Sequence, residues 1–180
     1  MSIIPEKMAP DPEEIFPVVD EDGRQIALAP RRICHDGKSK LLHPVVHLHL
    51  FDHKGNLYLQ KRASTKDLLP GCWDTSVGGH VNPGEAVEEA LKRETLEELG
   101  LRSFEYRFNK KYVWESARER ELVFSYSGRS SESPVADPGE IDEGRFWTVE
   151  EIRSKLGSGV FTPNFEHEFL FILSEQNLFV

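Results

Sequence analysis

Three carboxylates lie close together in the sequence, at Glu94, Glu97 and Glu98. Their spacings of three and four residues place them on one face of a helix, because successive helical residues turn by about 100°. Like charges at such spacings repel one another and destabilise an isolated helix. The cluster therefore suggests a compensating cation, and oxygen ligands alone suit a hard one such as Mg²⁺ or Mn²⁺.

Neighbouring residues favour a metal site over a solvated acidic face, which is our interpretation of the glutamates at positions 88 and 89. Glu85 is expected in the first turn of the helix, where the helix dipole favours negative charge. Gly100 is placed to end the helix in the left-handed conformation. Arg93 lies four residues before Glu97 and can hold that carboxylate in place. The segment is therefore interpreted as a cation-binding helix with defined ends.

The run from position 79 to position 101 resembles the Nudix box, Gly-x5-Glu-x7-Arg-Glu-U-x-Glu-Glu-x-Gly-U, in which U is an apolar residue. The matching residues keep the spacing of the box, and they are Gly79, Glu85, Arg93, Glu94, Glu97, Glu98, Gly100 and Leu101. Thr95 stands where the family usually has an aliphatic residue, and its methyl group can still pack. The resemblance implies the Nudix fold, an α/β/α sandwich around a central mixed β-sheet.

Nudix enzymes hydrolyse a phosphoanhydride in a nucleoside diphosphate that is joined to another group, and they use divalent cations to do so. The resemblance implies that Glu97 and Glu98 are metal ligands, assisted by the backbone carbonyl of Gly78. Glu94 would bind a metal or accept the proton of the attacking water, and Arg93 would orient the carboxylates. The general base varies within the family and is left open. The positions with a structural part in the motif are Gly79, Glu85 and Gly100.

A finer resemblance, over most of residues 35–101, is to the Nudix branch that contains isopentenyl-diphosphate isomerase. It is carried by Leu59-Gln60-Lys61-Arg62, Lys66, Pro70-Gly71-x-Trp73 and Gly79-His80. In the isomerase, two basic residues that match Arg62 and Lys66 hold the diphosphate. The resemblance also implies a second metal site, whose ligands in this chain would be His35, His43, His80, Glu119 and Glu121.

The catalytic residues of the isomerase are not matched. Its catalytic cysteine falls at Gly78, and neither cysteine of this chain is in register to replace it. Its catalytic tryptophan corresponds to Asn164 in a loose alignment. The isomerase in turn lacks carboxylates at the positions of Glu94 and Glu97. We therefore expect hydrolysis of a small-molecule diphosphate, with isomerisation or non-catalytic ligand sensing as the alternatives.

Length and composition indicate the domain organisation, the partners and the location of the protein. A chain of 180 residues with 38% hydrophobic residues fits one domain with a full core, expected over residues 15–180 and preceded by an N-terminal extension at 1–14. The net charge of −9 disfavours binding to a nucleic-acid backbone. No apolar run approaches the roughly 20 residues that span a bilayer. The N-terminus lacks a signal-peptide core, so a cytoplasmic location without membrane attachment is expected, and a homodimer is left open.

Alternating apolar residues and turn signals predict strands and helices in mixed order, which fits an α/β/α sandwich. Strands are expected at residues 15–19, 24–29, 41–51, 56–60, 73–79, 106–114, 121–126 and 145–148. Helices are expected at residues 85–99, from a capping box at 148–151 to 156, and at 163–176. The polar residues 127–143 are expected to form an exposed connection.

Overall fold

A computed structural model of the chain describes residues 13–64, 69–139 and 141–173. Its strands are β1 (Ile15–Val19), β2 (Gln25–Pro30), β3 (Leu42–Leu50), β4 (Leu57–Arg62), β5 (Trp73–Asp74), β6 (Val77–His80), β7 (Glu105–Glu115), β8 (Arg120–Arg129) and β9 (Ile141–Trp147). Its helices are α1 (Arg31–Cys34), α2 (Val87–Leu99), α3 (Val149–Lys155) and α4 (Pro163–Ile172).

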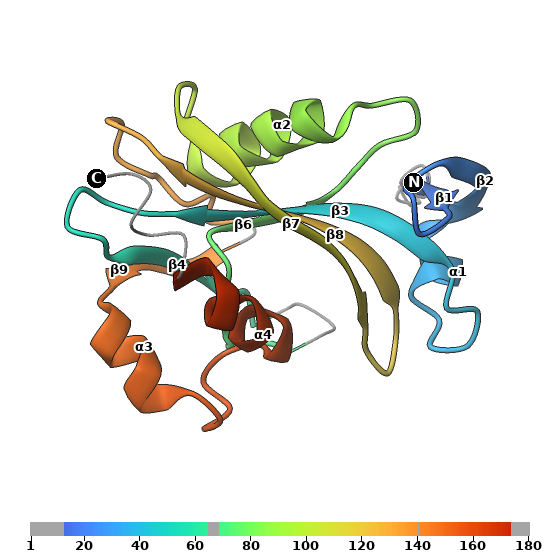
Figure 1. Ribbon diagram of the computed structural model, residues 1–180. Helices are drawn as coiled ribbons and strands as arrows, with labels where there is room; N and C mark the ends of the chain where they lie inside the picture. The colour runs from blue at the N-terminus through green and yellow to red at the C-terminus, as the bar shows by residue number, and fades with distance from the viewer. Residues whose placement is uncertain (1–12, 65–68, 140, 174–180) are drawn as a thin grey trace, which may run out of the picture.

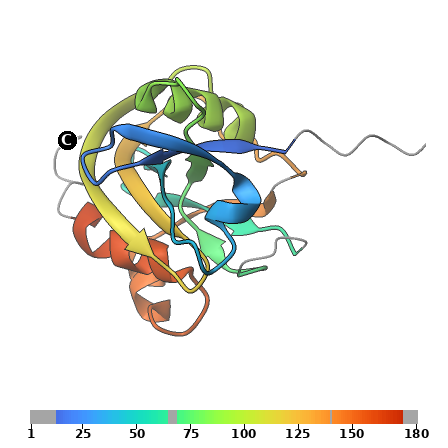
Figure 2. The ribbon, with the colours of Figure 1, turned by 90° about the vertical axis from the view of Figure 1, so that its right-hand side faces the viewer.

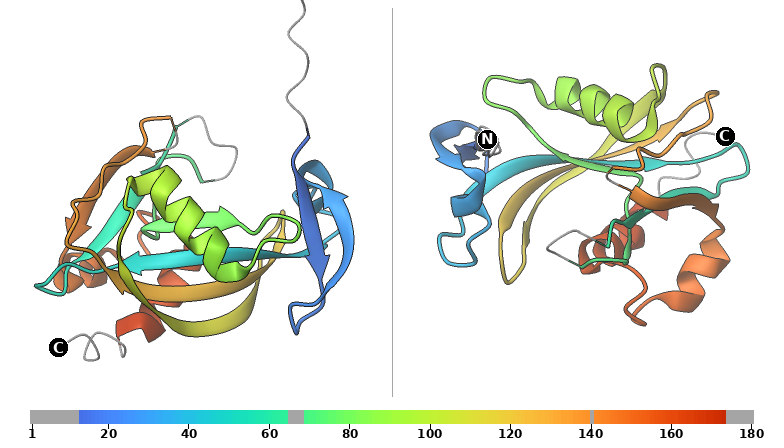
Figure 3. Two further views of the ribbon diagram at one scale, coloured as in Figure 1. Left: turned by 90° about the horizontal axis from the view of Figure 1, so that it is seen from above. Right: turned by 180° about the vertical axis from the view of Figure 1, so that it is seen from behind.

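The central sheet has the strand order β6-β3-β8-β7. Strand β3 is parallel to β8 and antiparallel to β6, so the sheet is mixed, as predicted. Helix α2 covers one face, and α3 and α4 lie on the opposite side (Figure 1). A second, antiparallel sheet of order β5-β4-β9 also lies on the side of α3 and α4 (Figure 3). The α/β fold class expected from the sequence is confirmed.

Strand β3 passes through the centre of the molecule and is buried along its whole length. Val46 and Leu48 join the apolar core under α2. The alternate residues His47 and His49 face the other side, where they lie beside Glu168 of α4. The alternation predicted for this strand is confirmed, and its polar face is buried as well.

Helix α2, which carries the three carboxylates, begins at Val87, two residues later than the sequence suggested. Glu85 therefore precedes the helix instead of lying in its first turn. The reason is a turn in which the Glu85 carboxylate accepts a hydrogen bond from the backbone N–H of Asn82 at 2.8 Å. Glu89 caps the helix by accepting a hydrogen bond from the backbone N–H of Ala86 at 3.0 Å.

The C-terminal end of α2 is the one that the sequence predicts. Gly100 has a φ of 67° and donates a backbone hydrogen bond to the carbonyl oxygen of Leu96 at 3.0 Å. Inside the helix, Thr95 is fully buried. Its hydroxyl donates to the carbonyl oxygen of Leu91 at 2.6 Å, so this departure from the motif leaves no buried hydroxyl without a partner.

Helices α3 and α4 begin with the caps expected from the sequence. Thr148 Oγ1 accepts from the backbone N–H of Glu151 at 3.1 Å, and the Glu151 carboxylate accepts from that of Thr148 at 2.8 Å. Thr162 Oγ1 accepts from the backbone N–H of Phe165 at 3.2 Å. The expected continuation of α4 to residue 176 lies outside the described residues. Within the part that the structure describes, no helix has the length and apolar character needed to cross a membrane.

The hairpin of β1 and β2 forms a sheet of its own at one end of the central sheet (Figure 2). Residues 1–12 of the expected N-terminal extension lie outside the described residues. The first described residues pair with α1, since Glu13 lies 2.6 Å from Arg32 and Glu14 lies 2.7 Å from Arg31. The hairpin and α1 are thereby tied together just before the central sheet begins.

The connection after β8 is shorter than we expected. Residues 127–143 were predicted to be an exposed connection, yet β8 continues to Arg129 and β9 begins at Ile141. Ser127 is fully buried because the ladder pairs it with His49 of β3. Strand β8 has a partner strand on each side, so its backbone groups are satisfied despite a turn-like composition.

We expect Gly100→Ala to lower the free energy of unfolding by about 1–2 kcal/mol, because a Cβ is disfavoured in the left-handed conformation. Urea denaturation followed by circular dichroism measures this change. Gly139→Ala is the matched control, because Gly139 does not have a positive φ and a Cβ there would meet nothing closer than 3.5 Å. Equal losses in the two variants would contradict the assigned helix end.

Candidate active site

Arg93 lies at the centre of the carboxylate cluster. Its guanidinium donates to both oxygens of Glu85, at 2.8 and 2.9 Å. It also donates to Glu94 at 2.7 Å and to Glu97 at 3.2 Å. A further hydrogen bond of 2.9 Å reaches the carbonyl oxygen of His80 at the end of β6. One cation thus holds three carboxylates against a strand, and its hydrogen bonds lower the pKa of Glu85 below the ordinary value.

Gly79 of β6 lets α2 approach the backbone of this strand. A Cβ at Gly79 would lie only 2.0 Å from Cδ of Glu94, so no other residue fits there without moving the carboxylate. At Gly78 the backbone N–H donates to Glu98 at 3.4 Å. Gln60 of β4 donates to the same carboxylate oxygen at 3.1 Å. The carboxylates of Glu94 and Glu98 therefore lie directly beside the strand.

The three carboxylates differ in their exposure to solvent. The side chain of Glu97 is 57% exposed, whereas that of Glu94 is 14% exposed and Glu98 is buried. All three lie on the side of α2 that meets β6, as their spacing suggested. Glu94 and Glu98 are held by the protein, and Glu97 extends from the same group into solvent.

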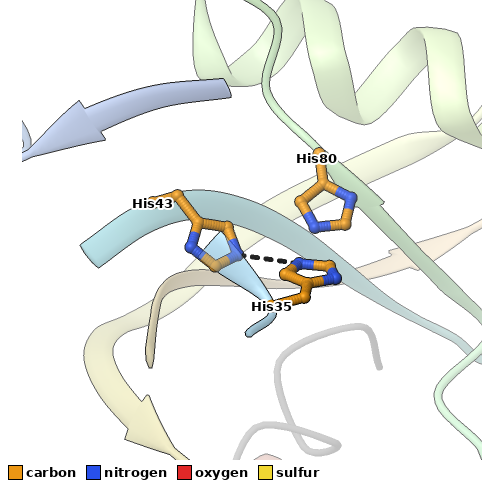
Figure 4. A group of neighbouring side chains, drawn as sticks. All are labelled: His35, His43 and His80. Atoms are coloured by element: carbon orange, nitrogen blue, oxygen red, sulfur yellow. Dashed lines mark hydrogen bonds between the residues drawn. The ribbon is translucent and has the colours of Figure 1, made fainter. Parts of the chain in front are cut away.

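Three histidines meet near the end of β6. His35 follows α1, His43 lies on β3 and His80 ends β6, and their ligand nitrogens lie within 4.8 Å of one another (Figure 4). The Nε2 atoms of His35 and His43 are 3.3 Å apart. Glu119 lies 3.4 Å from Nε2 of His35, and Glu121 is opposite His43 in the ladder of β3 and β8. The structure thus brings the five residues of the predicted second site to one end of the sheet.

The electrostatics of this histidine cluster suit a cation. Burial lowers the pKa of all three histidines, to about 4 for His35, so each ring is neutral near pH 7 and can ligate a metal. Nε2 of His80 is buried without a hydrogen-bond partner among the described residues. Burial, with repulsion from Glu119, raises the pKa of Glu121 to about 8. A divalent ion would give the orphaned nitrogen a partner and offset the repulsion of the carboxylates.

Phe16 of β1 closes the histidine cluster from the N-terminal hairpin. Its ring is fully buried and stacks on His80 with a centroid distance of 4.0 Å and an interplanar angle of 13°. It also stacks on His43 at 5.5 Å, and the guanidinium carbon of Arg31 lies 5.6 Å from its centroid. Sequence reasoning missed Phe16 because an apolar residue in a short strand carries no sign of what it packs against.

Of the two basic residues expected to hold a diphosphate, only Arg62 falls in the described part of the chain. It ends β4 and lies 3.1 Å from Asp74 of β5, with 30% of its side chain exposed. Asp74 is also bound by the Thr162 hydroxyl at 2.8 Å. Lys66 lies outside the described residues.

Sequence reasoning also missed Glu168, a fully buried carboxylate on α4. Its Oε2 accepts a hydrogen bond from Nδ1 of His47 at 2.7 Å and lies 3.2 Å from Nε2 of His49. Burial opposes charge on each group, but the two histidines lower the pKa of Glu168, and Glu168 raises that of His47 to about 9. The only available signal was two histidines at alternate positions of a buried strand.

Comparison with known proteins assigns the family. Residues 41–167 match the family of the NUDIX domain, and they make up more than half of the chain. The chain belongs to the Nudix family. The matched segment contains the box and β6, whereas the β1–β2 hairpin and His35 precede it. Part of the histidine cluster therefore comes from outside the segment that defines the family.

The proteins similar to this Nudix chain include isomerases and hydrolases. An isopentenyl-diphosphate Delta-isomerase of Streptomyces griseus is 33% identical over 154 residues, covering 82% of this chain and 78% of the isomerase. An uncharacterized Nudix hydrolase of Listeria monocytogenes is 32% identical over 142 residues, covering 73% of this chain and 79% of that protein. A crystal structure from Deinococcus radiodurans has a TM-score of 0.74 at 24% identity, covering 87% of this chain and 97% of that one. The last comparison supports the fold alone.

We expect His43→Gln to weaken the binding of Co²⁺ at least 10-fold, because the variant removes one of three converging imidazoles. Titration followed by the visible absorption of bound Co²⁺ measures the affinity. His53→Gln, which alters an exposed histidine in the turn before β4, is the matched control and should bind as the wild type does. If both variants bind Co²⁺ equally well, the histidine cluster is not a metal site.

Proposed function

We propose that this chain is a Mg²⁺- or Mn²⁺-dependent hydrolase that cleaves a phosphoanhydride in a nucleoside-diphosphate-linked or related diphosphate substrate. The observation that carries the proposal is the convergence of Glu94 and Glu98 on β6, with Arg93 fixing the group. The reaction must bring water to a phosphorus that is surrounded by anionic oxygens. Carboxylates held in place beside a strand backbone suit the binding of a hard cation for this task.

In this proposal Glu97 and Glu98 are metal ligands, together with the backbone carbonyl of Gly78. Mg²⁺, when bound, would neutralise oxygens of the diphosphate and lower the pKa of a bound water. Glu94 is either a further ligand or the acceptor of the proton from the attacking water. Arg93 keeps Glu94 and Glu97 in position through hydrogen bonds, and it remains charged throughout because a guanidinium is not deprotonated in proteins.

The histidine cluster and Arg62 complete the proposed substrate site. Arg62 would bind diphosphate oxygens, as would Lys66. A second divalent ion would be held by neutral imidazole nitrogens and by carboxylates. The residues that supply them are His35, His43, His80, Glu119 and Glu121. The structural observation that supports this second site is the buried Nε2 of His80, which has no hydrogen-bond partner among residues 13–64, 69–139 and 141–173.

Isomerisation of an isopentenyl-type diphosphate is the second candidate. The histidine cluster and the names of the similar isomerases favour it. Gly78 argues against it, because this residue stands where the isomerase has its catalytic cysteine. A Cβ at Gly78 would meet only ordinary contacts of 3.6 Å or more, so the glycine is not required by packing. Asn164, at the position of the catalytic tryptophan, accepts a hydrogen bond from Tyr112 at 2.7 Å.

A ligand sensor is less favoured, because all three box carboxylates are present.

We expect Glu98→Gln to lower hydrolysis by about 10²-fold or more, because loss of a metal ligand removes several kcal/mol of transition-state stabilisation. Cleavage of the phosphoanhydride is measured by ³¹P NMR over nucleoside diphosphate sugars, dinucleoside polyphosphates, nucleoside triphosphates and prenyl diphosphates, with Mg²⁺ or Mn²⁺. Glu88→Gln is the matched control, since Glu88 lies in the first turn of the same helix and accepts a hydrogen bond from the Tyr106 hydroxyl. Unchanged hydrolysis in folded Glu98→Gln would remove this residue from the catalytic site.

We expect isopentenyl diphosphate to yield no allylic isomer, because the chain has glycine at position 78. Gas chromatography of the dephosphorylated products separates isomerised from unchanged and hydrolysed material. Metal-loaded wild-type enzyme is used, so a negative result does not reflect an empty site. Rapid formation of the allylic isomer would reverse the order of the two candidates.

A further inference from the structure

Glu168 of α4 forms an ion pair with His47 of β3, in which Glu168 is fully buried and His47 is partly exposed. The side chains of Glu168 and His49 are 0% exposed, whereas that of His47 is 11% exposed. A buried carboxylate is stabilised by nearby hydrogen-bond donors, and His47 donates to Glu168 at 2.7 Å while Nε2 of His49 lies 3.2 Å away. Of the three side chains, His47 alone can also reach a solvent molecule or a ligand.

The hydrogen bond to Glu168 fixes the orientation of the His47 ring. Because a carboxylate only accepts, Nδ1 of His47 carries the proton in that bond, and Nε2 lies on the opposite edge of the ring. Within the part of the chain that the structure describes, Nε2 has no hydrogen-bond partner. A charged imidazole in this arrangement presents one N–H group that is not used by the fold.

The unused edge of His47 lies beside Gly78, the residue that precedes the box. His47 is directly opposite Gly78 in the ladder of β3 and β6. A Cβ added at Gly78 would be 3.7 Å from Nε2 and 3.6 Å from Cδ2 of His47. The space left by this glycine therefore adjoins the N–H group, and the backbone N–H of the same glycine contacts Glu98. The pair lies on the opposite face of the sheet from α2, and Gly78 lies between His47 and Glu98.

We propose that Glu168 and His47 form a substrate-binding pair, in which Nε2–H of His47 donates a hydrogen bond to an anionic oxygen of the diphosphate beside Gly78. This inference rests on the proposed function and adds a residue to its substrate site. Glu168 is a positioning residue, because it acts only through the ring that it holds. A donor fixed in advance by a buried carboxylate needs no reorganisation when the anionic oxygen arrives.

The chemistry around this N–H group selects an anionic oxygen over other ligands. Diphosphate is the anion that Arg62 and the box are proposed to receive, and charge-assisted hydrogen bonds to phosphate are short and strong. The hydrogen bond of Nδ1 to the buried carboxylate of Glu168 leaves Nε2–H as the donor that meets the entering oxygen.

The first experiment measures binding of methylenediphosphonate, a diphosphate analogue that is not hydrolysed, by calorimetry in the presence of Mg²⁺. We expect His47→Leu to bind it at least 10-fold more weakly than the wild type. Glu166→Gln is the matched control, because Glu166 lies on the same helix and bonds the backbone N–H of Gly157 at 2.9 Å. Equal affinities of folded His47→Leu and wild type would overturn the proposal.

Two further measurements keep the proposal testable if His47→Leu does not fold. Gly78→Ala adds a methyl group beside Nε2 at ordinary contact distances, and we expect it to fold and to bind the analogue at least 3-fold more weakly. In ¹⁵N-labelled wild-type protein, the Nε2 resonance of His47 should shift on addition of the analogue, while that of His53 should not. An unmoved Nε2 resonance at saturation would overturn the proposal.

The outcomes separate this inference from the proposed function. Hydrolysis by wild type together with unchanged binding in His47→Leu would reject the His47 contact and leave hydrolysis intact. Weakened binding in His47→Leu without hydrolysis of any substrate in the panel would retain the contact and reject the proposed reaction. In neither case does the result for one proposal decide the other.

Discussion

The hydrogen bonds of Arg93 are the interaction on which the arrangement of the site depends. Three carboxylates, those of Glu85, Glu94 and Glu97, approach one guanidinium, and without it their mutual repulsion would separate them. The same side chain reaches the carbonyl oxygen of His80, so it also fixes α2 against β6. Arg93 therefore links the position of the helix to the positions of these three carboxylates, and Gly79 permits the close approach.

Strand β6 connects the parts of the molecule that the proposals invoke. Gly78 contacts Glu98 and adjoins His47, Gly79 accommodates Glu94, and the ring of His80 enters the histidine cluster. Three consecutive residues thus face the box, the buried ion pair and the second candidate metal site. A movement of this short strand would alter all three, which gives a physical reason for the many contacts that hold it.

Local features of the sequence predicted much of this structure, and long-range contacts account for what was missed. The left-handed end at Gly100 and the cap at Thr148 follow from neighbouring residues, and both are as expected. The meeting of the predicted histidines was implied only by family resemblance. The pairing of Glu168 with His47 spans 121 residues, and a glutamate in an amphipathic helix looks the same whether it binds a buried histidine or solvent. The stacking of Phe16 is hidden from the sequence for the same reason.

In the proposed reaction, water attacks a phosphorus atom at the box. ³¹P NMR follows this attack in a nucleoside diphosphate sugar, or in whichever diphosphate of the panel is turned over, incubated with the protein and Mg²⁺ in H₂¹⁸O. We expect cleavage of the phosphoanhydride, with ¹⁸O in one of the two phosphate products, and loss of that signal in Glu98→Gln. Products in which the diphosphate is intact and the attached group is rearranged, or ¹⁸O incorporation that persists in folded Glu98→Gln, would contradict the proposed reaction.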